Sequence, residues 1–198
     1  WGELESNTTM EAEYVFLMHF LGMPDKARWR KIRNFILSRQ QADGGWNLYY
    51  GADSDLSTSC ESYLALKLAG MSADDPQLVR GRSFILGKGG VEKSRVFTKI
   101  WFALLGEWDW HGTPFLPPEM MLIPNRLPFS IYQFSMWSRA TIVPMSILLS
   151  SRPTHPVPEE AAIDELYLNG RENADSSLPA PGGLGIERLM FAADRLLA

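Results

Sequence analysis

Two glutamates stand at equivalent places in apolar segments of this chain. Glu13 precedes the apolar run 14–17, and Glu61, 48 positions later, precedes the apolar run 63–66. A carboxylate buried without a partner costs several kcal/mol, so each must meet a partner or face a polar or wet cavity. The pattern leaves two interpretations open: proton chemistry in a cavity, or a cap or salt bridge that stabilises the fold.

One arginine and two tryptophans complete the set of candidate functional residues. Arg95 is the expected partner of Glu61, because arginine pairs bidentately with carboxylates. Trp101 lies six residues further on, and its helical spacing favours core packing over cavity lining. Trp137 is either a buried core residue on a helix or an aromatic residue with a functional role. Three other aromatic residues are candidates for the same role: Phe129, Tyr132 and Phe134.

The composition argues against several other kinds of site. The net charge of -4 gives no reason to expect a nucleic-acid partner. The only cysteine, Cys60, is expected to be a small buried hydrophobe, and a single thiol suits a reducing compartment. His19, His111 and His155 are far apart in the sequence, so neither a metal site nor a cofactor is expected.

The glutamates belong to a repeated arrangement. Segments 9–23 and 57–71 match at an offset of 48 and both close on Gly-Met, while 33–37 and 82–86 match at an offset of 49. The order is helix, glycine turn, helix, loop, and a third partial copy covers 95–106. Such a period predicts two-helix repeats that bury their apolar faces against one another.

Residues 40–46 are expected to brace the first hairpin. Gln40 has an amide that would bond backbone groups exposed at a helix end. Gly44 and Gly45 permit a tight turn with positive φ, and Trp46 would fold back on that turn.

The second half of the sequence has a different character. Five prolines in 112–128 predict an extended loop without a helical turn. A helix is expected over about 129–149, with a kink before Pro144. Residues 151–184 are expected to be loops, and a short last helix to begin near Ile186.

Residues 40–46 resemble the QW motif of the squalene–hopene cyclase and oxidosqualene cyclase family. Further segments similar to bacterial squalene–hopene cyclases follow in the same order: 6–15, 90–98, 117–119 and 137–141. The resemblance extends to about residue 158. It implies an all-α fold, an α/α toroid or barrel of helical hairpins with QW-type braces, which would be a partial barrel here with proline-rich loops.

The resemblance also implies an isomerase-type reaction. The family protonates squalene with an acid from a DXDD motif and folds it into a pentacyclic cation that yields hopene or hopanol. Here 53–55 and 74–75 are loop acids that lack the pattern. Residues 1–198, which open on Trp1, are therefore expected to be a single fragment of the N-terminal barrel domain, inactive without a C-terminal catalytic domain.

The resemblance assigns roles to the candidate residues. Glu13, Glu61 and Arg95 match a polar network at the end of the cavity where the last cation loses its proton. Trp101 matches a cavity-lining position, and Trp137 matches a tryptophan that stabilises a cationic intermediate.

Two other functions are compatible with the sequence. A class II diterpene cyclase would need basic residues for a diphosphate, for which Arg95, Arg126 and Arg139 are available. A non-catalytic α/α-toroid binding module would also lack the acid. For the leading hypothesis the partner is squalene, and peripheral or monotopic contact with the cytoplasmic side of a bacterial inner membrane is expected. A homodimer is left open.

Overall fold

The described residues form two compact units. The computed structural model describes residues 7–114, 116–127 and 130–176. Unit 1 takes its described residues from the chain up to Trp108 and from Thr154–Ser176, and unit 2 takes them from Asp109–Pro153. The assignment of all 198 residues to one domain stays a prediction.

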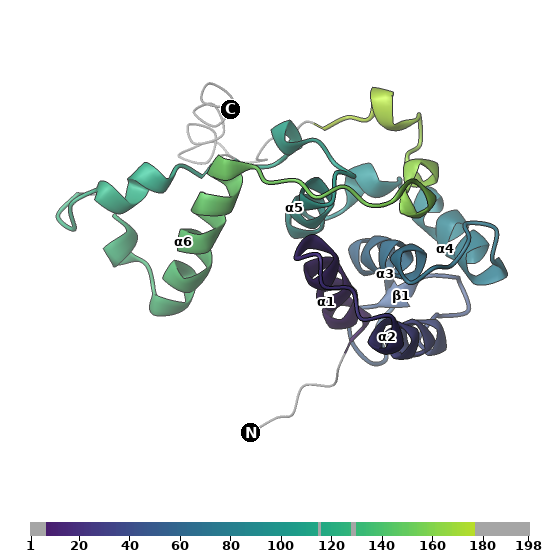
Figure 1. The fold of residues 1–198 in the computed structure, drawn as a ribbon. Coiled ribbons are helices and arrows are strands. Elements are labelled where there is room, and N and C mark those ends of the chain that lie inside the picture. Colours follow the sequence, from purple (N-terminus) through teal and green to yellow (C-terminus); the bar gives the residue numbers. More distant parts are fainter. Residues whose placement is uncertain (1–6, 115, 128–129, 177–198) are drawn as a thin grey trace. The chain divides into compact units, whose positions relative to one another are not determined.

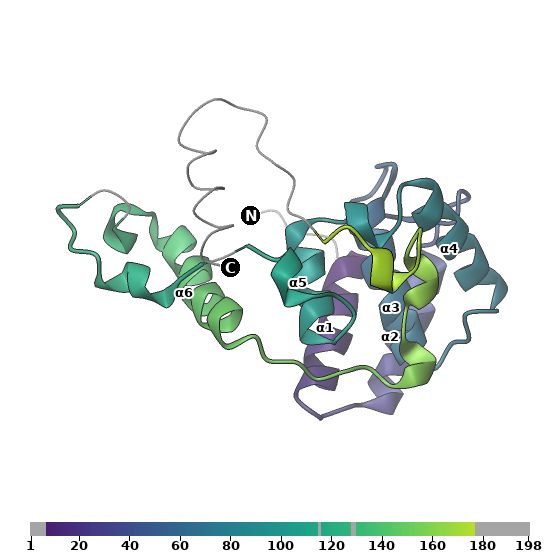
Figure 2. The same cartoon turned by 90° about the horizontal axis from the view of Figure 1, so that it is seen from above.

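Unit 1 is built from two helical hairpins and one further helix. Their bounds are α1 Thr8–Phe20, α2 Lys26–Ser38, α3 Leu56–Leu68, α4 Pro76–Gly87 and α5 Val96–Leu104. The hairpins turn at Gly22 (φ +67°) and Gly70 (φ +89°), as the repeated pattern predicts. The helix α3 contacts α1, α2, α4 and α5 and is buried from Ser57 to Lys67, so it forms the centre of the unit (Figures 1 and 2).

The two first helices of the hairpins begin in the same way. Asn7 caps α1 by accepting a hydrogen bond from the Met10 amide, and Asp55 caps α3 by accepting one from the Thr58 amide. Short polar side chains satisfy amides that a helix leaves unpaired in its first turn. Asp55, which the sequence presents as a loop acid, is therefore a helix cap.

The segment 40–46 joins three elements of unit 1. The Gln40 amide donates to the carbonyl oxygens of Gly44 and Gln77, both at 2.8 Å, and thus ties its own turn to α4. The buried Trp46 indole donates to the Ile36 carbonyl at 2.8 Å, near the end of α2. A positive φ of +92° occurs at Gly44 but not at Gly45.

The only sheet in the described residues follows this segment. Strand β1, Trp46–Asn47, pairs antiparallel with β2, Ser54–Asp55, and Trp46 lies opposite Asp55. The described chain is otherwise helical or irregular, which agrees with the predicted all-α class. The closure of a barrel stays a prediction.

The segment Thr154–Ser176, which completes unit 1, packs against its helices through polar contacts. It contains the 3-10 helices η5 Glu159–Ala161, η6 Asp164–Leu166 and η7 Arg171–Asn173. Elsewhere in unit 1, the 3-10 helix η1 Val91–Lys93 precedes α5. Glu165 pairs with Lys67 of α3 at 2.7 Å and accepts a hydrogen bond from Tyr63 at 2.8 Å. The segment is thus irregular, as expected, yet held firmly to the central helix.

Unit 2 differs from the sequence prediction at two places. It contains η2 Trp110–Gly112, η3 Pro118–Leu122, η4 Ile131–Gln133 and α6 Met136–Ser151. The prediction of no helical turn in the proline-rich stretch is wrong at η3, because proline is well tolerated in the first turn. The helix expected from residue 129 begins at Met136, where the Ser135 hydroxyl caps it by accepting from the Ser138 amide. Pro144 lies inside α6.

Two expectations fall on residues outside the described ranges: the role of Phe129 and the helix near Ile186. Among the residues whose structure is described, no helix combines the length and the apolar character needed to cross a bilayer.

Candidate functional site

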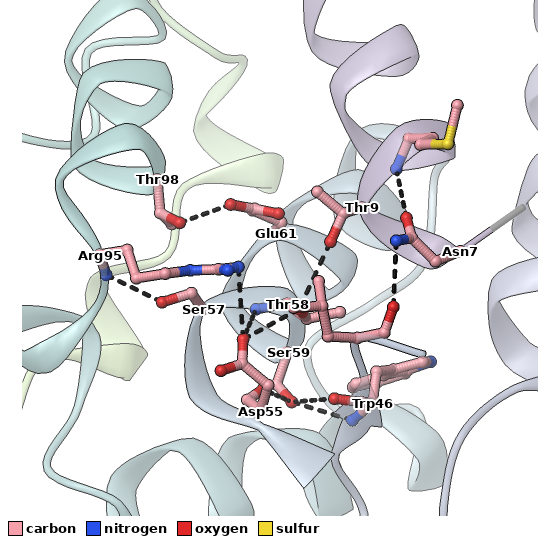
Figure 3. Close-up of polar contacts among 12 residues, drawn as sticks. Asn7, Thr9, Trp46, Asp55, Ser57, Thr58, Ser59, Glu61, Arg95 and Thr98 are labelled. Carbon is pink, nitrogen blue, oxygen red and sulfur yellow. Dashed lines mark hydrogen bonds and ion pairs between the residues drawn. The ribbon is translucent and has the colours of Figure 1, made fainter. Parts of the chain in front are cut away.

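Glu61 is a buried carboxyl group on the central helix. Its exposed fraction is 2%, because α3 is covered by other elements on nearly every side. Its Oε1 accepts a hydrogen bond from the Thr98 hydroxyl of α5 (Figure 3). Its Oε2 is buried and has no hydrogen-bond partner among the described residues. One oxygen is therefore fixed and the other is left to receive a proton.

The surroundings make Glu61 a much weaker acid than usual. Burial is the largest influence and raises its pKa from 4.5 to about 7. The hydrogen bond from Thr98 opposes this increase, whereas the negative charge of Glu13 adds to it. Arg95 and the nearby Thr9 hydroxyl exert weaker lowering effects. A group with a pKa near neutrality is able to accept and to release a proton, which is what general acid–base chemistry requires.

Glu13 lies on α1 and joins the same cluster. Burial raises its pKa, while a hydrogen bond from Trp101 and the charge of Arg95 lower it. Trp101, on α5, packs its ring 5.9 Å from that of Phe16. The structure thus brings Glu13, Glu61 and Trp101 together from three helices of unit 1. Trp101 is partly buried, and its place in the lining of a cavity stays a prediction.

Arg95 does not form the ion pair that the sequence predicts. Its Nη2 lies 3.4 Å from Asp55 Oδ1, and its backbone amide donates to Ser57 Oγ at 2.8 Å. Asp55 is at the half-exposed start of α3, whereas Glu61 lies six residues deeper, about 9 Å along the helix axis. The predicted pairing with Glu61 is therefore wrong, although Arg95 lies near enough for its charge to lower the pKa of both glutamates.

Sequence reasoning missed two members of this site. Thr98 has a detectable signal, since it lies three residues from both Arg95 and Trp101 and such spacing puts side chains on neighbouring positions of a helix surface. Asp55 has a weaker one, namely an Asp directly before an apolar periodic run.

Trp137 lies in α6 of unit 2 and is 82% exposed. The alternative that it is a buried core residue is therefore wrong. Its expected role in stabilising a cation stays a prediction. Tyr132 and Phe134 are 61% and 38% exposed, so they are surface aromatics as well.

The cysteine and the histidines were further candidates for chemistry. Cys60 is fully buried, and burial raises the pKa of its thiol, which confirms the expected buried hydrophobe. The rings of His19 and His155, distant in the sequence, lie 5.0 Å apart in unit 1. In the described part of the chain, no three His, Cys, Asp or Glu residues come together in a way that would hold a metal ion.

A groove of about 630 Å³ opens elsewhere on unit 1, between the start of α1, the end of α2 and the loop after β1. None of Glu13, Glu61, Arg95, Trp101 and Trp137 lines it. The groove is therefore separate from the carboxyl cluster.

Comparisons with known proteins identify the family. The family described as the squalene-hopene cyclase N-terminal domain matches residues 1–198. The chain is 49% identical over 167 residues to the squalene–hopene cyclase of Alicyclobacillus acidocaldarius, covering 84% of this chain and 26% of that protein. It is 40% identical over 202 residues to the dammaradiene synthase of Dryopteris crassirhizoma, covering 99% and 30% respectively.

A fungal protein shows the same likeness. The squalene hopane cyclase of Aspergillus fumigatus is 41% identical over 174 residues, covering 85% of this chain and 24% of that protein. The chain thus spans about a quarter of the length of the curated relatives it matches. With a family match over its whole length, this chain belongs to the squalene–hopene cyclase N-terminal domain family.

Proposed function

We propose that this chain is part of a triterpene cyclase that converts squalene by cationic polycyclisation into hopene and hopanol. Family membership and relatives named squalene–hopene cyclase support this proposal. The observation that carries it is Glu61, a carboxyl group that is buried on the central helix α3 and held at one oxygen by the Thr98 hydroxyl. Such a group suits the last step of a cation cascade.

Termination of the cascade needs a proton acceptor in apolar surroundings. When the final cation loses a proton, the electron pair of the C–H bond becomes the new C=C bond, and the proton passes to the carboxylate or to a water molecule beside it. When water adds instead, its oxygen forms the C–O bond and its extra proton passes to the same acceptor. A carboxyl group with a pKa of about 7 is able to serve in both steps.

The neighbours of Glu61 extend this acceptor into a network. Glu13 provides a second carboxyl group whose pKa is also raised by burial. The Trp101 indole orients Glu13, and the charge of Arg95 favours the ionised forms. Together these groups would determine whether a hydrocarbon or an alcohol leaves the cavity.

We assign Trp137 to an earlier step, in which its indole face stabilises a cationic intermediate. A desolvated cation gains ~2 kcal/mol or more over such a face. The substantial exposure of Trp137 within the described residues is compatible with a surface that meets substrate or another domain. The segment 40–46 would act as a QW brace of an α/α barrel.

The proposal includes partners. The initiating acid would come from a DXDD motif in a C-terminal catalytic domain, so residues 1–198 alone would be inactive. The enzyme would be a monotopic protein on the cytoplasmic side of a bacterial membrane, where squalene dissolves.

The test is product analysis by gas chromatography and mass spectrometry. The full-length protein that carries this chain is incubated with squalene in detergent micelles, next to the 198-residue chain alone and next to an assay with geranylgeranyl diphosphate. We expect pentacyclic hydrocarbon and alcohol from squalene and from the full-length protein only. Products from the diphosphate would favour a diterpene cyclase, and no conversion of either substrate would favour a binding module.

A further inference from the structure

We propose that Asp55 is a positioning residue for the buried carboxyl group of Glu61: by holding the Arg95 guanidinium at the start of α3, it keeps this cation from pairing with Glu61. The inference rests on the proposed function, because it assigns Asp55 to the reaction through the proton acceptor. Asp55 itself touches none of the reacting atoms.

The contacts of Asp55 fix its carboxylate in place. Its Oδ1 accepts hydrogen bonds from the Thr58 amide at 2.8 Å and the Thr58 hydroxyl at 2.9 Å (Figure 3). Its backbone carbonyl accepts from Ser59 Oγ at 2.7 Å, and the residue pairs with Trp46 across the two strands. Asp55 is thereby fixed by Trp46 of the brace on one side and by the first turn of α3, which it caps, on the other.

Arg95 is held at its backbone amide by Ser57 and at its guanidinium by Asp55. Its amide donates to Ser57 Oγ at 2.8 Å, whereas the guanidinium is held by the 3.4 Å contact with Asp55, and 46% of the side chain is exposed. Arginine has a long side chain with several rotatable bonds and a planar fork that fits carboxylates bidentately. Without the charge of Asp55, the guanidinium would be drawn towards the carboxylates of Glu13 and Glu61, whose ionised forms its charge already favours.

The consequence falls on the proton affinity of Glu61. The groups that act on Glu61 are Glu13 and Thr9 from α1, Thr98 from α5, and Arg95 at the start of α5. A carboxylate in direct contact with a guanidinium is a weaker base, since the cation stabilises its ionised form. Asp55 therefore preserves the proton affinity of Glu61, while Thr98 holds Oε1 and limits that affinity.

The experiment compares pH profiles of the hydrocarbon-to-alcohol ratio in the full-length protein. Asn is as good a helix cap as Asp, so Asp55→Asn removes the charge and keeps the cap. We expect the midpoint of the pH profile of Asp55→Asn to lie about one pH unit or more below that of the wild type. Thr98→Val should move the midpoint in the opposite direction, because it removes a hydrogen bond that favours ionised Glu61. Asp55→Glu, which restores a carboxylate, should bring the midpoint back towards that of the wild type.

A matched control exists in the first hairpin. Asp25 caps α2 and lies 3.8 Å from Arg28, so Asp25→Asn changes the same kind of cap and ion pair away from the cluster. This variant should keep the wild-type profile. If Asp55→Asn does not fold, Asp55→Ser keeps a favoured cap residue and takes its place.

An unchanged midpoint in Asp55→Asn, or the same shift in Asp25→Asn, would overturn the proposal. Infrared titration of the protonated-carboxyl band, with Glu61→Gln to assign the band, gives a second readout that needs no turnover. If the wild type converts no squalene, the proposed function fails. The infrared midpoint then still decides whether Asp55 controls Glu61.

Discussion

A carboxyl group that is buried among helices must either lose its charge or find a cation. Glu61 finds a hydroxyl donor, Thr98, while the nearest arginine is engaged by Asp55. Burial therefore dominates and raises the pKa of Glu61 to about 7. Because burial outweighs the hydrogen bond from Thr98, Glu61 changes its protonation state near neutral pH.

The raised pKa of Glu61 predicts a pH-dependent stability. Between about pH 4.5 and pH 7 Glu61 is more fully protonated in the folded protein than in the unfolded chain, so its contribution to the free energy of unfolding decreases as pH rises. Glu61→Gln removes this effect. We expect the free energy of unfolding of the variant, relative to that of the wild type, to rise by on the order of 3 kcal/mol from acid to weakly alkaline pH. Urea unfolding across this range measures it, and a pH-independent difference would contradict the assignment.

Trp137 allows stability and chemistry to be separated. Because the side chain is 82% exposed, Trp137→Ala should change the free energy of unfolding by less than about 0.5 kcal/mol. If the indole stabilises a cation, the same variant should lower the rate and release products of early termination. Tyr50→Ala, which removes an aromatic side chain of 83% exposure in unit 1, is the control and should leave products unchanged. An unaltered product profile in Trp137→Ala would discard its role.

At the scale of the elements, the brace at 40–46 determines where α3 begins. Trp46 is fully buried, bonds the end of α2 through its indole and accepts β pairing with Asp55 through its backbone. Ser59 receives a hydrogen bond from the Trp46 amide at 2.9 Å. The brace therefore supports Asp55, the residue that positions Arg95.

The close approach of this brace to α4 predicts a sensitive glycine. Gly44 has φ +92°, and a Cβ there would come within 2.6 Å of the Arg80 carbonyl oxygen. We expect Gly44→Ala to cost roughly 2–4 kcal/mol of stability, from backbone strain together with overpacking. Gly51→Ala is the matched control, since Gly51 has φ +78° but open space around it, and should cost about 1 kcal/mol. Equal losses of melting temperature in both variants would contradict the packing argument.

The helical hairpins could be predicted from the sequence because their apolar periods, their glycine turns and the offset of 48 are local signals. The start of α6 could not, because a single hydroxyl, that of Ser135, sets it within a long apolar stretch. The candidate site was predicted in part. Glu13, Glu61 and Trp101 belong to one cluster, because the charge of Glu13 acts on Glu61 and Trp101 bonds to Glu13. Only the three-dimensional structure shows that Arg95 pairs with Asp55.

At the scale of the whole molecule, the cluster is contained in unit 1. Its residues come from α1, α3 and α5, and the returning segment 154–176 is fixed to α3 by the Lys67–Glu165 pair. The aligned part of this chain covers only 26% and 24% of two of the relatives. The central claim, that Glu61 ends a cation cascade, is therefore a claim about the full-length protein.

The most direct measurement of that claim is the product ratio of Glu61→Gln in the full-length enzyme with squalene, determined together with KM and melting temperature in weakly acidic buffer. Glutamine keeps the shape of the side chain and cannot accept the proton. We predict slower turnover and an altered hydrocarbon-to-alcohol ratio with KM changed less than about twofold, since an interaction used only in the transition state affects turnover and not binding. An unchanged ratio accompanied only by a change in melting temperature would contradict the account.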